Sequence, residues 1–192
     1  MRLKKWFFLL GALLLLPSCM NMATTGAQAV YNRQQLQKSL NDHYLTMRSY
    51  RALDIDSPLF KNANISVSTL NGEILLTGQV PEAWQKAEAE KILKTIPGIK
   101  HIYDLLTVEQ PLPQVARAKD AWITTKVKAQ LMASNDVDAS QVKVLTENGV
   151  VYLMGILPPS EAKEATSIAA TTKGVKGVVK IFTYVKISKS PD

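Results

Sequence analysis

Alternating apolar and polar residues mark two similar segments of the chain. Residues 65–81 read ISVSTLNGEILLTGQVP, and residues 142–158 read VKVLTENGVVYLMGILP. An Asn-Gly pair interrupts each alternation, and this dipeptide favours a tight turn between two antiparallel strands. The two segments also share a later glycine and a final proline, at a constant offset of 77. The pattern therefore predicts two copies of one β-hairpin, which we call repeat 1 and repeat 2.

Helical periodicity surrounds each hairpin. Alanine-rich helices are expected after the prolines, at Glu82–Ile96 and Ser160–Thr172, and amphipathic helices before the hairpins, at about His43–Leu53 and Lys119–Ala133. Third strands are expected at Leu105–Glu109 and Val179–Lys186. The element order predicts an α+β fold with two tandem αββαβ domains. Each would contain a three-stranded mixed sheet with two helices on one face.

The N-terminal segment has a different pattern. Three basic residues within the first five positions precede an apolar run at 6–16. The run is too short to cross a bilayer as a helix and is typical of an export signal. It is followed by Leu16-Pro17-Ser18-Cys19, which resembles a bacterial lipobox, the site at which a cysteine is acylated. We expect a lipoprotein signal peptide at 1–18 and lipidation of Cys19, with a plain signal peptide as the alternative.

The residue after Cys19 indicates the destination of the protein. Position 20 holds Met, and not the Asp that resembles an inner-membrane retention signal. We therefore expect a lipid-anchored protein at the periplasmic face of the outer membrane. Residues 19–42 have little apolar periodicity and are expected to form an acylated tether that is helical from Tyr31 onwards. The remaining expected parts are domains at 43–110 and 119–187, a Pro-containing linker at 111–118 and a tail at 188–192.

The order of the elements and their motifs resembles the BON domain. Repeat 2 carries the closest match, in the segments WITTKV at 122–127, TENG at 146–149 and LMG at 153–155. An acylated cysteine followed by two such domains is similar to the dual BON-domain outer-membrane lipoproteins. The resemblance implies a non-enzymatic protein that supports envelope integrity at cell-division sites and assists the β-barrel assembly machinery. It also implies binding of anionic phospholipids, namely phosphatidylglycerol and cardiolipin, through the first helix of the second domain.

That helix contains residues suited to lipid contact. At 100° per residue, one stripe holds the core residues, and a neighbouring stripe holds Trp122, Lys119, Lys126 and Ala129, with Met132 and Ala133 at its end. An indole flanked by ammonium groups is typical of a membrane-interface contact. Helical geometry leaves open the alternative that Trp122 packs against the other domain and the lysines are merely solvated. The resemblance favours lipid, because it maps the family tryptophan onto Trp122 and its basic neighbour onto Lys126.

Charge separates the two repeats. The whole chain has a formal net charge of +7. Residues 43–110 hold 7 basic and 8 acidic residues, whereas residues 114–187 hold 10 basic and 6 acidic residues. Only repeat 2 would be attracted to an anionic surface, where each basic residue contributes about 1 kcal/mol.

Gly78 and Gly155 occupy equivalent positions near the ends of the two hairpins. We expect both to be structural or interdomain positions, where an added side chain would disturb the backbone or the packing between domains. The resemblance implies that Gly78 lies near the contact between domains. Neither glycine is expected to bind a ligand.

The composition argues against several other functions. One cysteine and two histidines leave little material for a metal centre, and no Gly-rich phosphate loop or nucleophile motif is present. We expect no catalytic residues, no metal and no cofactor. Nucleic acid is not an expected partner, since an exported protein rarely meets it and no aromatic-rich binding strand is present. The alternative function is a protein-interaction module that docks an envelope complex without lipid specificity.

Overall fold

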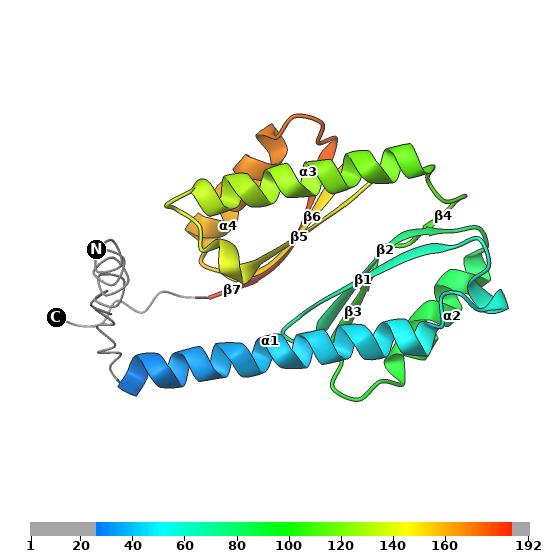
Figure 1. Cartoon of the computed structure of the whole chain (residues 1–192), viewed down its shortest axis with the longest axis horizontal. Helices are drawn as coiled ribbons and strands as arrows, with labels where there is room; N and C mark the ends of the chain where they lie inside the picture. The colour runs from blue at the N-terminus through cyan, green and yellow to red at the C-terminus, as the bar shows by residue number, and fades with distance from the viewer. Residues whose placement is uncertain (1–25, 186–192) are drawn as a thin grey trace, which may run out of the picture. The chain divides into compact units, whose positions relative to one another are not determined.

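The computed structural model describes residues 26–185 of the chain. The expected signal peptide, Cys19 and the expected tail at 188–192 lie outside this range. Of residues 26–185, those from Gln37 onwards belong to one compact unit, which contains both hairpin repeats. Within the described residues, the two repeats build two mixed sheets with helices packed on them (Figure 1).

Repeat 1 begins with a long helix and continues with the predicted hairpin. Its elements are α1 (Gly26–Leu53), η1 (Pro58–Phe60), β1 (Asn64–Leu70), β2 (Glu73–Val80), α2 (Ala83–Lys94), β3 (His101–Asp104) and β4 (Thr107–Val108). Strands β1 and β2 are antiparallel, and β3 and β4 both pair in parallel with β2. The turn residues Asn71 and Gly72 both have positive φ, at 54° and 80°, as the Asn-Gly signal requires.

Repeat 2 has the same order of elements. They are α3 (Gln114–Ala133), η2 (Ala139–Gln141), β5 (Val142–Glu147), β6 (Val150–Leu157), α4 (Pro159–Thr171) and β7 (Gly177–Tyr184). Strand β6 lies between β5, with which it is antiparallel, and β7, with which it is parallel. The predicted α+β fold with tandem αββαβ units is therefore confirmed.

Each sheet buries one face beneath its two helices. In repeat 2, Ile123, Val127 and Leu131 of α3 are buried in the core, as their spacing predicts. The other helix, α4, contributes small residues to this core, including Ala165 and Ala169. Figure 1 shows α3 and α4 on the same side of their sheet. The outer surface of α3 is consequently turned away from both the core and the sheet.

The other faces of the two sheets contact each other. Leu75 of β2, Met154 of β6 and Ile181 of β7 form a buried apolar cluster between the repeats. The amide Nε2 of Gln79 donates a hydrogen bond of 2.7 Å to Oε1 of Glu147 across the same contact. Because the sheets meet through these faces, the helices of both repeats lie on the outside.

The first helices are longer than expected. Helix α1 runs without a break from Gly26, so it joins the helical segment expected from Tyr31 to the amphipathic helix expected from His43. Helix α3 begins at Gln114 instead of Lys119. At the start of α3, the carbonyl of Pro113 accepts hydrogen bonds from the amides of Ala116 and Arg117. The helix thus begins directly after Pro113, because a proline in a helix interior would remove a backbone hydrogen bond. Residues 114–118 of the expected linker are therefore helical.

The expected third strand of repeat 1, Leu105–Glu109, is wrong. Strand β3 ends at Asp104, and β4 holds only Thr107 and Val108. The interruption arises because Oδ1 of Asp104 accepts the amide of Leu106 at 3.1 Å. The side chain of Leu106 enters the core, whereas Leu105 packs against the cluster between the sheets.

Candidate functional site: the outer face of α3

A buried aspartate sets the orientation of α3. Asp120 is only 6% exposed, and its carboxylate accepts the amides of Asn148 and Gly149, each at 2.8 Å. These two amides belong to the β5–β6 turn, so the helix is fixed to the hairpin by two charge-assisted hydrogen bonds. Because Asp120 faces the sheet, Trp122, two positions further along, is directed outwards.

Trp122 is the most prominent group on this outer face. Its side chain is 64% exposed, although indole rings are usually well buried. Lys119, one turn before it, is exposed as well. Val115 lies on the same stripe and is 68% exposed. It was not among the predicted site residues, because the helix was expected to begin only at Lys119. The sequence pattern that could have identified Val115 is its apolar side chain seven residues before Trp122, which places both on one face of a helix.

The C-terminal part of the stripe is also open to solvent. Met132 is 74% exposed, and Ala129 and Ala133 are exposed. The outer face of α3 therefore presents exposed apolar side chains with Lys119 and Lys126 between them.

Lys126 differs from the other predicted site residues. It is half-buried, and its ammonium group donates a hydrogen bond to the carbonyl of Lys173, in the loop after α4. This hydrogen bond connects α3 to that loop. Lys126 therefore combines a structural contact with its position beside Trp122.

Repeat 1 carries an equivalent but different arrangement. Asp42 binds the amides of its own turn as Asp120 does, which makes Tyr44 the counterpart of Trp122 and Arg48 the counterpart of Lys126. The guanidinium carbon of Arg48 lies 5.6 Å from the centre of the Tyr44 ring. In repeat 1 the basic group thus makes a cation–π contact with the aromatic ring, and Tyr44 is 55% exposed.

The two predicted glycine positions have different environments. Gly78 has a φ of +114°, and a Cβ built there would lie 2.0 Å from the carbonyl oxygen of Asn64. Gly155 has no positive φ, and its nearest neighbour would be a Leu157 methyl group at 3.1 Å. Each glycine is adjacent in sequence to a residue of the contact between repeats, Gln79 in one case and Met154 in the other.

Two ionisable groups are partly buried at the contact between the repeats. Burial lowers the pKa of Lys143, whose ammonium donates to the carbonyl of Thr69 in repeat 1. Burial likewise raises the pKa of Glu147, which the hydrogen bond from Gln79 partly offsets. Neither group lies on the outer face of α3, so we regard both as part of the contact between repeats.

Among residues 26–185, no group of three or more His, Cys, Asp or Glu side chains could hold a metal ion. Across the same residues, no helix has the length and apolarity needed to cross a membrane.

Comparison with known proteins places the chain in a family. Residues 41–110 and 119–186 each match the BON domain. The chain is 33% identical to Outer membrane lipoprotein DolP of Haemophilus influenzae, over 95% of this chain and 97% of that protein. It is 35% identical to the 21 kDa hemolysin of Actinobacillus pleuropneumoniae, over 77% of this chain and 76% of that protein. It is 33% identical to Osmotically-inducible protein Y of Escherichia coli, over 72% of this chain and 70% of that protein. The chain belongs to the BON-domain family, as an outer-membrane lipoprotein that carries two BON domains in tandem.

Proposed function

We propose that this chain is a non-enzymatic lipoprotein that binds anionic phospholipid, phosphatidylglycerol or cardiolipin, through the outer face of α3. The observation that carries the proposal is the exposure of Trp122 beside Lys119, on the face of α3 turned away from the core. At a membrane, the indole ring would lie at the depth of the headgroups, and the ammonium group would contact phosphates. Burial of Trp122 between the repeats would have favoured a protein-docking module instead.

The charges of α3 support an anionic ligand. Its basic residues are Arg117, Lys119, Lys126 and Lys128. Its single acidic residue, Asp120, is buried on the opposite side of the helix, where its carboxylate accepts two turn amides, so it does not lie on the face that carries Trp122. Each basic residue near an anionic membrane contributes about 1 kcal/mol, which falls off within a Debye length.

Acylation of Cys19 forms part of the same proposal. Two or three acyl chains would hold the protein at the periplasmic face of the outer membrane. The binding of α3 would then be an intramolecular event at high effective concentration, so a weak contact would suffice to orient the domain. Enrichment at division sites and support of the β-barrel assembly machinery complete the proposal, and they rest on the family resemblance alone.

Liposome co-sedimentation tests the lipid contact. The experiment uses the chain from residue 19 onwards with Cys19→Ser, which removes the acyl chains as a source of binding. We expect the protein to sediment with phosphatidylglycerol vesicles and not with phosphatidylcholine vesicles. Trp122→Glu should weaken binding about tenfold or more, because it places a negative charge at the membrane contact.

Repeat 1 offers a matched control for this substitution. Tyr44→Glu makes the same kind of change at the equivalent position, and we expect it to leave vesicle binding within about twofold of the parent chain. Circular dichroism should show that both variants remain folded. Equal losses in the two variants would contradict assignment of the site to α3. Absence of binding to either vesicle would contradict the lipid contact and favour the protein-interaction module.

A further inference from the structure

A second basic feature lies in repeat 2, away from the outer face of α3. Helix α4 and strand β7 border an open groove of about 330 Å³. The residues that line it are Pro159, Ala162, Lys163, Thr166, Lys180 and Tyr184. No acidic side chain is among them, so two lysines face the groove without a carboxylate in its walls.

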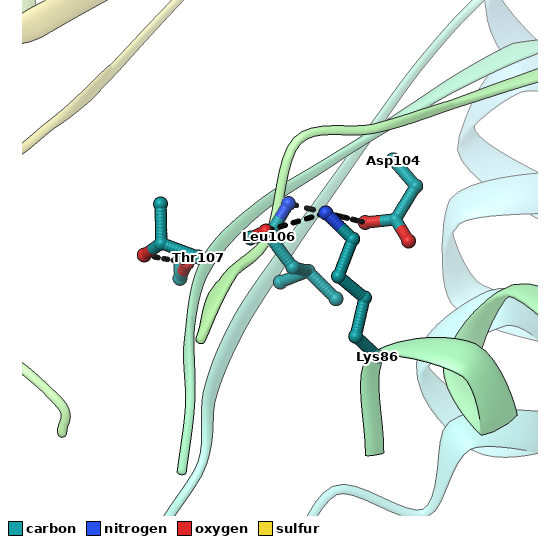
Figure 2. Close-up of polar contacts among 5 residues, drawn as sticks. Lys86, Asp104, Leu106 and Thr107 are labelled. Atoms are coloured by element: carbon teal, nitrogen blue, oxygen red, sulfur yellow. Dashed lines mark hydrogen bonds and ion pairs between the residues drawn. The ribbon is translucent and has the colours of Figure 1, made fainter. Parts of the chain in front are cut away.

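The corresponding place in repeat 1 is closed by an ion pair. Figure 2 shows the ammonium group of Lys86, on α2, directed towards Asp104 and Leu106. Its Nζ lies 3.8 Å from Oδ1 of Asp104 and donates a hydrogen bond of 2.7 Å to the carbonyl of Leu106. The basic group of repeat 1 is therefore neutralised by the chain itself.

The strand register shows that the two places are equivalent. Asp104 pairs with Leu76 of β2, and Lys180 pairs with Leu153 of β6. Leu76 and Leu153 occupy the same position of the repeated hairpin, because the offset of 77 applies to both. Lys86 is the fourth residue of α2 and Lys163 is the fifth residue of α4, so the two lysines occupy neighbouring positions at the starts of corresponding helices. Repeat 2 thus has Lys180 at the strand position where repeat 1 has Asp104, the ion-pair partner of Lys86.

Two ammonium groups on one groove repel each other unless an anion lies between them. Among residues 26–185, neither Lys163 nor Lys180 takes part in an ion pair. Tyr184 is 60% exposed and brings a phenolic hydroxyl to the same groove. Two ammonium groups and a hydroxyl match a phosphate group, which offers several oxygen acceptors and up to two negative charges.

We propose that the groove between α4 and β7 is a binding site for a phosphate group, held by Lys163 and Lys180. The groove volume lies at the small end of the range for ligand sites, about 300–1,000 Å³, and suits a phosphate with a small substituent. This site is separate from Trp122 and does not depend on the lipid contact proposed above. The phosphate can belong to a small soluble molecule or to a lipid headgroup.

Titration with inorganic phosphate, followed by amide chemical shifts in ¹H–¹⁵N spectra, tests the site. The protein is the chain from residue 19 with Cys19→Ser, and sodium chloride at matched ionic strength serves as the reference. We expect saturable shifts for α4 and β7 near Lys163 and Lys180. Lys180→Asp should lower the affinity for phosphate about tenfold or more, since it places a carboxylate beside Lys163, as Asp104 lies beside Lys86 in repeat 1. This variant is expected to fold, because Asp104 occupies the same register position in repeat 1.

Two further variants sharpen the titration. Lys61→Asp changes the net charge by the same amount on an exposed position of repeat 1 and should leave the phosphate shifts intact. Lys163→Ala removes the other ammonium group and should weaken binding as Lys180→Asp does. Shifts that persist unchanged in Lys180→Asp, or that disappear equally in Lys61→Asp, would overturn the proposal.

A vesicle arm distinguishes the two sources of phosphate. Trp122→Glu alone and combined with Lys180→Asp are compared on phosphatidylglycerol vesicles. Residual binding that requires Lys180 would assign the groove to a lipid headgroup, and phosphate shifts without such binding would assign it to a small soluble ligand. If neither probe produces an effect that depends on Lys180, the groove is not a phosphate site. That result would leave the lipid contact of Trp122 untouched.

Discussion

The two repeats share their interiors and differ in what they leave open on their surfaces. In both, a buried aspartate on the first helix accepts two amides of the Asn-Gly turn, Asp42 in one and Asp120 in the other. In both, a threonine on the same helix forms a hydrogen bond to a threonine of the first strand. These paired contacts hold the same αββαβ fold in two sequences of different charge.

The surfaces differ at two equivalent places. Repeat 1 places Arg48 against Tyr44, which remains 55% exposed, and pairs Lys86 with Asp104, so these two basic groups have partners within the chain. Repeat 2 leaves Trp122 exposed and aligns Lys163 with Lys180. A duplicated domain can thus keep one copy as a self-contained support while the other copy presents its groups to ligands.

The largest difference between the repeats is expected at the paired glycines. Gly78→Ala should lower the free energy of unfolding by about 3 kcal/mol or more, because the new Cβ meets the backbone carbonyl of Asn64 at a strained φ. Gly155→Ala should cost less, about 1–2 kcal/mol, since its φ is not strained and the side chain of Leu157 can move aside, although the Cβ would also lie 3.2 Å from the backbone carbonyl of Gln141. Urea unfolding of the two variants measures both values. Equal costs would contradict the difference in backbone conformation.

A smaller and equal effect is expected at the paired aspartates. Asp42→Asn and Asp120→Asn each replace one carboxylate oxygen with an amide group that cannot accept a turn N–H. Each should cost about 2 kcal/mol, in line with hydrogen bonds to buried charged groups. The same urea experiment tests this, with the parent chain as reference. Costs that differ by more than about 1 kcal/mol would show that the two aspartates do not serve their repeats alike.

The hairpins and the order of the helices could be predicted because their signals are local. Asn-Gly between alternating apolar residues and alanine-rich runs after proline require no knowledge of distant contacts. The exposure of Trp122 was not determined by the sequence, because helical geometry placed the ring at the border of the core. Only the contact between the sheets, which lies on the side opposite to α3, resolves that ambiguity.

Other features have no signal in the hydrophobic pattern. The interruption of the third strand follows from the hydrogen bond that the carboxylate of Asp104 accepts from the amide of Leu106. The hydrogen bond between the first helix and the turn could have been predicted from the sequence. Asp42 and Asp120 precede the asparagine of their turns by nearly the same number of residues, 29 and 28. The pair of Lys163 and Lys180 becomes visible only when the register of β7 is combined with the repeat.

The smallest expected effect concerns the pH dependence of the contact between the repeats. Glu147 occupies the position equivalent to Leu70, so repeat 2 places a carboxyl group where repeat 1 has an apolar side chain. Burial is the main cause of its raised pKa, nearby Asp120 and Glu109 raise it further, and Arg117 lowers it. A raised pKa means that the folded chain binds this proton more tightly than the unfolded chain does. This group's contribution to stability therefore falls as the pH rises from the ordinary glutamate pKa through the folded value.

Glu147→Gln isolates that contribution. The glutamine keeps an oxygen that can accept the hydrogen bond from Gln79, and it removes the charge that burial disfavours. The variant should be more stable than the parent chain at neutral pH by less than about 1 kcal/mol, because solvent reaches the carboxyl group and screens its interactions. Urea midpoints measured between pH 4 and pH 7 should differ most at the upper end and converge as Glu147 becomes protonated. A variant that is less stable than the parent at pH 7 would show that the ionised carboxylate is stabilising, and that its bond to Gln79 outweighs its desolvation.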